Sequence, residues 1–118
     1  MPLYAYLAPG KSVRLPMPEI QIFGGGAHAG RRVDIQDFMV MALGARSFDN
    51  AIAMTAEVYR AAGELMSEAG KLQGVADEGG FWPAFASNEE ALTMLMRAIE
   101  RAGYRPGEDI GISLDVAA

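Results

Sequence analysis

The stretch from Val75 to Pro83 constrains the fold more than any other part of this chain. A short apolar segment leads into the adjacent carboxylates Asp77 and Glu78, which are followed by two glycines, an aromatic pair and a proline. This pattern predicts a buried strand that delivers acidic side chains into a turn. Because ligands bind at strand ends in parallel α/β folds, the acidic pair is a candidate site. A solvated turn is the alternative that these residues alone leave open.

Two amphipathic helices are predicted on either side of this stretch. Ser47 is a suitable N-cap for a helix over about 48–69. Ser87 and Glu90 have the spacing of a capping box, which predicts a second helix over about 88–102. The apolar face of the first helix is expected to comprise Phe48, Ala51, Ile52, Thr55, Val58, Tyr59, Ala62, Leu65, Met66 and Ala69. That of the second helix is expected to comprise Leu92, Leu95, Met96 and Ile99.

Three further strands are predicted at 20–23, 33–41 and 110–118, and the last is expected to be buried with one acid, Asp115, near its end. In the second of them a polar end, expected to face a site, precedes a buried end. The order strand, strand, helix, strand, helix, strand favours βα units and a parallel sheet. The first two strands, joined by a glycine-rich loop, could instead pair antiparallel. The last strand would leave an apolar sheet edge unpaired, which is unusual at the end of a finished domain.

The composition of the 118 residues indicates one globular, soluble domain and excludes several kinds of partner. A net charge of -5 argues against nucleic acid as the main partner, because phosphate binding needs clustered lysine and arginine. The absence of cysteine excludes disulfides and thiolate metal sites. The longest apolar run, 38–45, is far shorter than the roughly 20 residues of a membrane-spanning helix. A cytoplasmic protein with no membrane partner is therefore expected.

Six motifs follow one another along the chain: GGGAHAG at 24–30, VDIQDFM at 33–39, DEGGF at 77–81, SNEEAL at 87–92, AGYRPGEDI at 102–110 and LDVA at 114–117. In this order and spacing they resemble the enolase family, the phosphopyruvate hydratases of glycolysis. The resemblance implies an α/β fold, namely the β-β-α-β-α-β portion of a (β/α)8 TIM barrel of the enolase type. It also implies that residues 1–12 end an N-terminal domain and its linker. Residues 13–118 would then begin the C-terminal barrel domain, which takes about 250 residues when complete.

The resemblance further implies a magnesium-dependent lyase that dehydrates 2-phospho-D-glycerate to phosphoenolpyruvate. Glu78 matches the general acid that protonates the leaving hydroxyl. Asp115 matches the first of three carboxylates that hold Mg²⁺, a cation that prefers oxygen ligands. His28 matches a substrate-binding histidine on a mobile glycine-rich loop. Gln36 and Asp37 match residues at the edge of the substrate.

Two positions depart from the family pattern. Asp37 stands where the family has glutamate, so its carboxyl group is set back by about 1.5 Å, the length of one carbon–carbon bond. Gly24 stands where the family has asparagine. These departures leave open an enolase-like lyase that acts on a different phosphorylated or carboxylated acid.

The resemblance also implies parts that this chain does not contain. The family uses a lysine from later in the barrel as its base, and neither Lys11 nor Lys71 matches that position. Two carboxylate ligands of the metal also fall outside the chain. We therefore expect the isolated chain to be inactive, whereas the complete protein is expected to be an active homodimer. A non-catalytic half-barrel that self-associates through its sheet edge is the alternative.

Overall fold

The computed structural model describes residues 1–25 and 35–116. The described residues form an α/β structure in which two long helices are interleaved with strands, as the sequence predicts. In chain order the elements are α1 (Leu3–Leu7), β1 (Ile20–Gly24), β2 (Asp37–Met41), α2 (Phe48–Glu68), β3 (Leu72–Val75), β4 (Phe81–Pro83), α3 (Asn88–Arg101) and β5 (Gly111–Asp115).

The strands form one open, mixed sheet in the order β3-β4-β1-β2-β5. β1 and β2 pair antiparallel, which was the alternative left open by the glycine-rich loop between them. β4 runs parallel to β1, whereas β5 runs antiparallel to β2 and β3 runs antiparallel to β4. The strands β1, β4 and β5 therefore share one direction, as βα units require, but β2 separates β1 from β5. The prediction of a parallel sheet is correct only for the pair β1 and β4.

The prediction of one buried strand leading into the acidic pair is wrong. The structure has a hairpin in which β3 precedes the acids and β4, the aromatic segment, follows them. β3 lies at the edge of the sheet with a single neighbour, and the side chain of Val75 is 52% exposed. β4 is the inner strand next to β1, and Phe81 is buried there. The acids consequently lie in the turn of a hairpin.

Two of the predicted strands, those at 33–41 and 110–118, are shorter than expected, and the second of them is also more exposed. β2 begins at Asp37, and residues 33 and 34 of the predicted strand lie outside the described residues. β5 forms the other edge of the sheet and pairs only with β2, so that it is half-buried or exposed along its length and Val116, just beyond it, is 68% exposed. The expectation of a buried last strand is therefore wrong, whereas the expected apolar edge is present.

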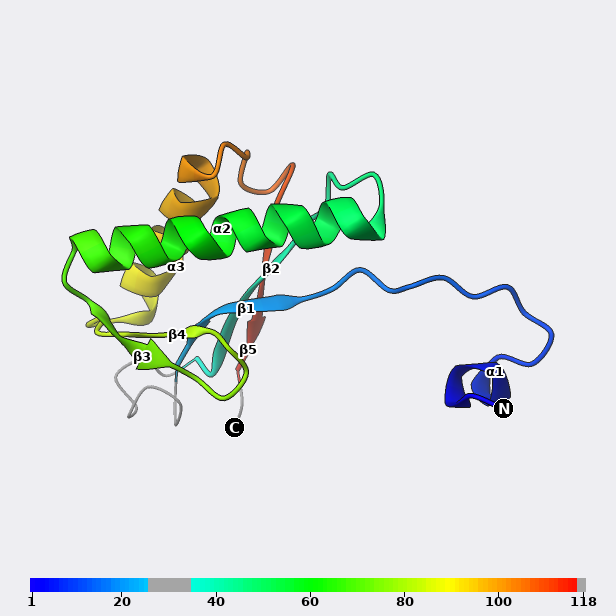
Figure 1. Cartoon of the computed structure of the whole chain (residues 1–118). Coiled ribbons are helices and arrows are strands. Elements are labelled where there is room, and N and C mark those ends of the chain that lie inside the picture. The colour runs from blue at the N-terminus through cyan, green and yellow to red at the C-terminus, as the bar shows by residue number, and fades with distance from the viewer. Residues whose placement is uncertain (26–34, 117–118) are drawn as a thin grey trace.

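Both helices begin as predicted. The Ser47 hydroxyl accepts a hydrogen bond from the Asn50 backbone at 3.0 Å, and the Ser87 hydroxyl accepts one from the Glu90 backbone at 3.1 Å. The Glu90 carboxylate accepts in turn from the Ala86 backbone at 2.9 Å. These bonds satisfy amide groups that the first turn of a helix would otherwise leave without partners. The two helices pack on each other and both contact the sheet (Figure 1).

The buried faces of the helices differ in part from the predicted ones. Phe48 and Ile52 are each 41% exposed, although Ala51, Met54 and Thr55 in the same turns of α2 are buried, so the buried stripe is narrower than predicted. Met54 and Met66 are buried as packing residues of α2. In α3, Met94 is buried in place of the predicted Met96. The core itself joins both helices to β1 and β2, where Ile22, Phe23, Phe38 and Val40 are fully buried. Burial of such side chains contributes about 1.5–3 kcal/mol each.

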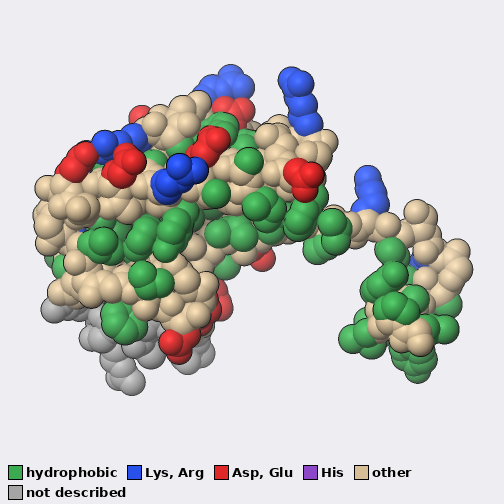
Figure 2. Space-filling view, in the orientation of Figure 1, with side chains coloured by type: hydrophobic (Ala, Val, Ile, Leu, Met, Phe, Trp, Pro, Cys, Tyr) green, Lys and Arg blue, Asp and Glu red, His purple; other side chains and the backbone are tan. Residues whose placement is uncertain are grey.

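The N-terminal segment leads away from this core (Figure 1). The tip of this segment is α1, at the start of the chain. This helix has no buried residue, and hydrophobic side chains cover its surface (Figure 2). Buried residues of the core hold β1 and β2, and the described candidate residues lie at the start of β2, at the end of β5 and in the hairpin turn.

Candidate active site

A row of three residues crosses the sheet where the glycine-rich connection begins and ends. Asp37, the first residue of β2, is the cross-strand partner of Gly24 on β1 and of Asp115 on β5. Side chains of direct cross-strand partners project from the same face of a sheet. The two carboxylates of the row are therefore neighbours, with Asp37 half-buried and Asp115 exposed.

Two side-chain amides hold the carboxylate of Asp37. Gln21 on β1 donates a hydrogen bond from Nε2 to Asp37 Oδ1, and Gln36 donates from Nε2 to Asp37 Oδ2 at 3.3 Å. The Gln36 backbone N–H also donates to the Asp115 carbonyl at 3.0 Å. Gln36, Asp37 and Asp115, three of the residues predicted for the site, are thus brought together.

The turn that carries Asp77 and Glu78 is closed by its own backbone. The Gly79 N–H donates to the Ala76 carbonyl at 2.9 Å, and the Ala76 N–H donates to the Gly80 carbonyl at 2.7 Å. Gly79 has a φ of 99°, a conformation that a residue with a side chain adopts only under strain. Glu78 is exposed on this turn.

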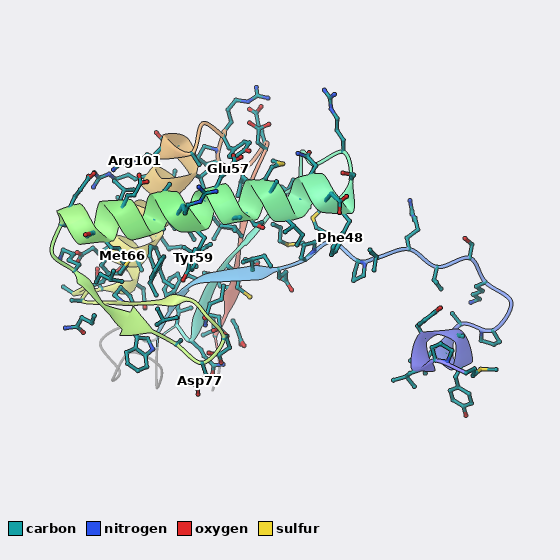
Figure 3. All side chains as sticks on the ribbon, in the orientation of Figure 1. Phe48, Glu57, Tyr59, Met66, Asp77 and Arg101 are labelled. Carbon is teal, nitrogen blue, oxygen red and sulfur yellow. The ribbon has the colours of Figure 1, made fainter. Side chains whose placement is uncertain are left out.

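Helix α2 anchors the turn from the other side. The Tyr59 hydroxyl donates to the Gly79 carbonyl at 2.9 Å, and the Tyr59 ring stacks on Phe81 with centroids 4.3 Å apart. Figure 3 labels Tyr59 on the side of α2 that faces the sheet and Asp77 at the hairpin turn. Helix α2 therefore holds the turn at the Gly79 carbonyl and at the Phe81 ring, which follows the glycine pair.

The turn and the row of strand residues are linked through Gln21. The Gly80 N–H donates to Gln21 Oε1 at 2.8 Å, while the other end of the same amide holds Asp37. Glu78 is thus connected to the row through Gly80, Gln21 and Asp37. Sequence reasoning missed Gln21, and its only signal was one polar residue within the apolar strand 20–23. His28, the fifth predicted site residue, lies outside the described residues.

The donors present fit a Mg²⁺ site only in part. Asp115 offers an exposed carboxylate, and carboxylate oxygen is the ligand type that Mg²⁺ prefers. Within 1–25 and 35–116, however, no three histidine, cysteine, aspartate or glutamate side chains are grouped closely enough to hold a metal ion. Asp115 can therefore supply one ligand, and a complete set would need residues from elsewhere.

Other charged groups of the chain form ion pairs or hydrogen bonds that join α2 and α3 to neighbouring segments. Lys71 forms an ion pair with Glu90 at 2.6 Å, and a hydrogen bond from Lys71 lowers the pKa of that carboxyl group. The Tyr104 hydroxyl donates to Glu57, and this bond, aided by burial, raises the pKa of Tyr104 to about 12.

A concavity of about 910 Å³ lies between residues 14–18 and the start of α2, and none of the proposed site residues lines it.

No helix in the described part of the chain has the length and apolarity needed to cross a membrane.

Comparison with known proteins gives one family for nearly the whole chain. Residues 12–118 match the family described as "Enolase, C-terminal TIM barrel domain". A curated protein called "Enolase 1", from Desulfitobacterium hafniense (strain Y51), is 50% identical over 119 aligned residues. The alignment covers 100% of this chain but 27% of that protein, so the chain spans about a quarter of its relative's length. The chain therefore belongs to the enolase family, and its open α/β sheet is part of the C-terminal TIM barrel domain of that family.

Proposed function

We propose that the complete protein carrying this chain is an enolase, which converts 2-phospho-D-glycerate to phosphoenolpyruvate and water in glycolysis. The observation that carries the proposal is the cross-strand pairing of Asp37 with Asp115. By family resemblance one of these residues contacts the substrate and the other binds Mg²⁺, and a shared site needs them side by side. Membership of the enolase family supports the same conclusion.

Glu78 is proposed as the general acid. A base takes the proton next to the substrate carboxylate, and the electron pair of that C–H bond forms the new double bond as the neighbouring C–O bond breaks. The departing hydroxide takes a proton from the Glu78 carboxyl group and leaves as water. Anchoring of the turn by Tyr59 supports this role, because a general acid must be held within hydrogen-bond reach of the group that it protonates.

The remaining residues of this chain are proposed to bind and orient the substrate. Gln36 and Asp37 would contact it from the start of β2, and His28 would do so from the glycine-rich connection. Asp115 would hold Mg²⁺ together with ligands from outside the chain. When bound, Mg²⁺ supplies positive charge that stabilises negative charge on the substrate carboxylate.

The base is proposed to come from a part of the protein outside these residues. Lys71 is engaged by Glu90 at the start of α3, and Lys11 lies on the N-terminal segment next to α1. The isolated chain is therefore proposed to be inactive. For the complete protein we propose a cytoplasmic homodimer without a nucleic-acid or membrane partner, with the domain boundary near residue 12.

Steady-state assay of the complete protein tests the proposal. With 2-phospho-D-glycerate and Mg²⁺, we expect phosphoenolpyruvate to form with kcat/KM within the usual enzyme range of about 10⁴–10⁸ M⁻¹s⁻¹. The Asp115→Asn variant is the control for contaminating enolase, because it should lose most of this activity. Lack of product in the presence of Mg²⁺ would refute the proposal.

Two alternatives have observations of their own. Asp37, which is shorter than the family's glutamate and lies beside Gly24, favours a lyase that acts on a different phosphorylated or carboxylated acid. Faster turnover of such an acid than of 2-phospho-D-glycerate would support this alternative. The exposed Leu114 and Val116 on the β5 edge favour a self-associating half-barrel. The intact mass of the protein captured from its native source decides the latter: a mass several times 12.6 kDa supports the enolase proposal, and a mass near 12.6 kDa supports the half-barrel.

A further inference from the structure

Gln21 occupies an irregular position in β1. The pairing of β1 with β2 shifts register between Gln21 and Phe23, so that Ile22 and Phe23 are both fully buried. Such bulges change the direction in which a side chain leaves a strand. Gln21 itself is half-buried, and its side chain lies between the hairpin turn and the row of strand residues.

Both ends of the Gln21 amide are used, and its partners define its orientation. Oε1 accepts from the Gly80 N–H, and Nε2 donates to the Asp37 carboxylate. The opposite orientation would place the NH₂ group against an N–H donor and the oxygen against a carboxylate, so only one orientation satisfies both partners.

The turn is shaped to receive this amide. A Cβ atom at Gly80 would lie 2.6 Å from Gln21 Cδ and 2.7 Å from Gln21 Cγ, which is closer than packed atoms approach. Only glycine leaves the space that the Gln21 side chain fills. A larger residue at this position would have to displace the Gln21 side chain and so break its hydrogen bonds.

We propose that Gln21 is a positioning residue of the enolase site, which fixes the Asp37 carboxylate relative to the turn that carries Glu78. The proposal rests on the proposed function for its catalytic consequence. Asp37 has one methylene fewer than the family's glutamate, and the long side chain of Gln21 reaches it from β1. The combined length of the two side chains therefore spans the gap between the turn and the substrate edge.

Variants of the complete protein test this role. Gln21→Leu keeps the approximate size of the side chain and removes both hydrogen bonds. Because a hydrogen bond to a charged group is lost, we expect kcat to fall about 10- to 100-fold. KM should change less, since the role proposed for Gln21 is to position Asp37 and not to bind the substrate itself. Unchanged kcat in this variant would overturn the proposal.

Shortening Gln21 while lengthening Asp37 distinguishes a positioning role of Gln21 from a role in stability alone. Gln21→Asn withdraws the amide by about 1.5 Å and should lower kcat. Combining it with Asp37→Glu restores the total number of methylenes and should recover most of the lost kcat. Thermal unfolding of each variant shows whether stability follows the same order. A double variant no more active than Gln21→Asn alone would contradict the proposal.

Hydrogen exchange gives a readout that does not depend on activity. In Gln21→Leu the Gly80 amide should exchange faster, because it loses its acceptor. The Gly79 amide, which donates to Ala76, is the internal control and should be unchanged. Wild-type protein without enolase activity would refute the proposed function, and Gly80 exchange would still test whether Gln21 links the turn to Asp37. If the enzyme is active but Gly80 exchange in Gln21→Leu is unaltered, only the link through Gln21 is refuted.

Discussion

Asp37 on β2 and Asp115 on β5 are direct cross-strand partners, so two acids of like charge face each other across the sheet. Like charges in this arrangement destabilise a sheet. The amides of Gln21 and Gln36 donate to Asp37 and offset part of this cost. A cation bound by Asp115 would offset more. The pairing costs stability, and the proposed roles of both acids in binding would account for it.

The first prediction follows from this repulsion. Asp115→Asn in the complete protein should weaken Mg²⁺ binding by at least about tenfold, because one charged oxygen ligand is lost. Without metal, the same variant should be more stable than wild type by about 0.2–1 kcal/mol. Isothermal titration with Mg²⁺ and urea unfolding measure the two effects. Glu100→Gln, which removes an exposed acid on α3, is the control and should leave Mg²⁺ affinity unchanged. Unaltered affinity in Asp115→Asn would exclude the ligand role.

The second prediction concerns the general acid. Glu78→Gln should lower kcat by about 10²–10⁴-fold, because the amide cannot deliver a proton to the leaving hydroxyl. The fold should be intact, since this side chain is exposed on the turn. Asp77→Asn changes the neighbouring acid and should have a much smaller effect. Steady-state kinetics and circular dichroism of both variants provide the measurement, and parity of Glu78→Gln with wild type would remove Glu78 from the mechanism.

The third prediction concerns the space at Gly80. Gly80→Ala should destabilise the protein by about 1–3 kcal/mol, because the added Cβ overlaps the Gln21 side chain. Adding Gln21→Ala should relieve the overlap and restore part of this stability, but it should not restore kcat. Urea unfolding and steady-state assay together distinguish the two effects. Independent, additive losses of stability would mean that the two residues do not meet.

The fourth prediction concerns alkaline pH. The hydrogen bond to Glu57, with burial, raises the pKa of Tyr104 to about 12, against about 10 for an unfolded tyrosine. A group whose pKa is raised by folding contributes stability that is fully present below the unfolded pKa. This contribution should decline as the pH rises from about 10 to about 12. Urea midpoints measured across this range should fall more steeply for wild type than for Tyr104→Phe. Equal slopes would show that the bond to Glu57 contributes no stability.

The helices could be predicted from the sequence because their signals are local. Ser47 and Ser87 cap the first turns through residues only three positions away, and the apolar period identifies a buried stripe. The period does not define how wide the buried stripe is, which is why the prediction that Ile52 is buried is wrong. The family motifs in turn identified the fold, and Asp37 and Asp115, two of the residues expected in the site, are cross-strand neighbours.

The strands were harder to predict because edge position is a property of the whole sheet. β3 and β5 have apolar residues typical of buried strands, yet each has a single neighbour. β4 was missed because three residues ending in Pro83 carry little strand signal. Nor does any local pattern show that Gln21 would meet Gly80, which lies 59 positions further along the chain.

The direction of β2 has a consequence for engineering the connection between β1 and β2. Because β2 runs against β1 and β5, the connection between the first two strands leaves the row at Gly24 and rejoins it at Asp37, and its ends are joined by a hydrogen bond from Gly25 N–H to the Gln36 carbonyl at 2.7 Å. A longer or shorter segment grafted between these two ends is therefore expected to leave the register of the strands that carry the acids unchanged.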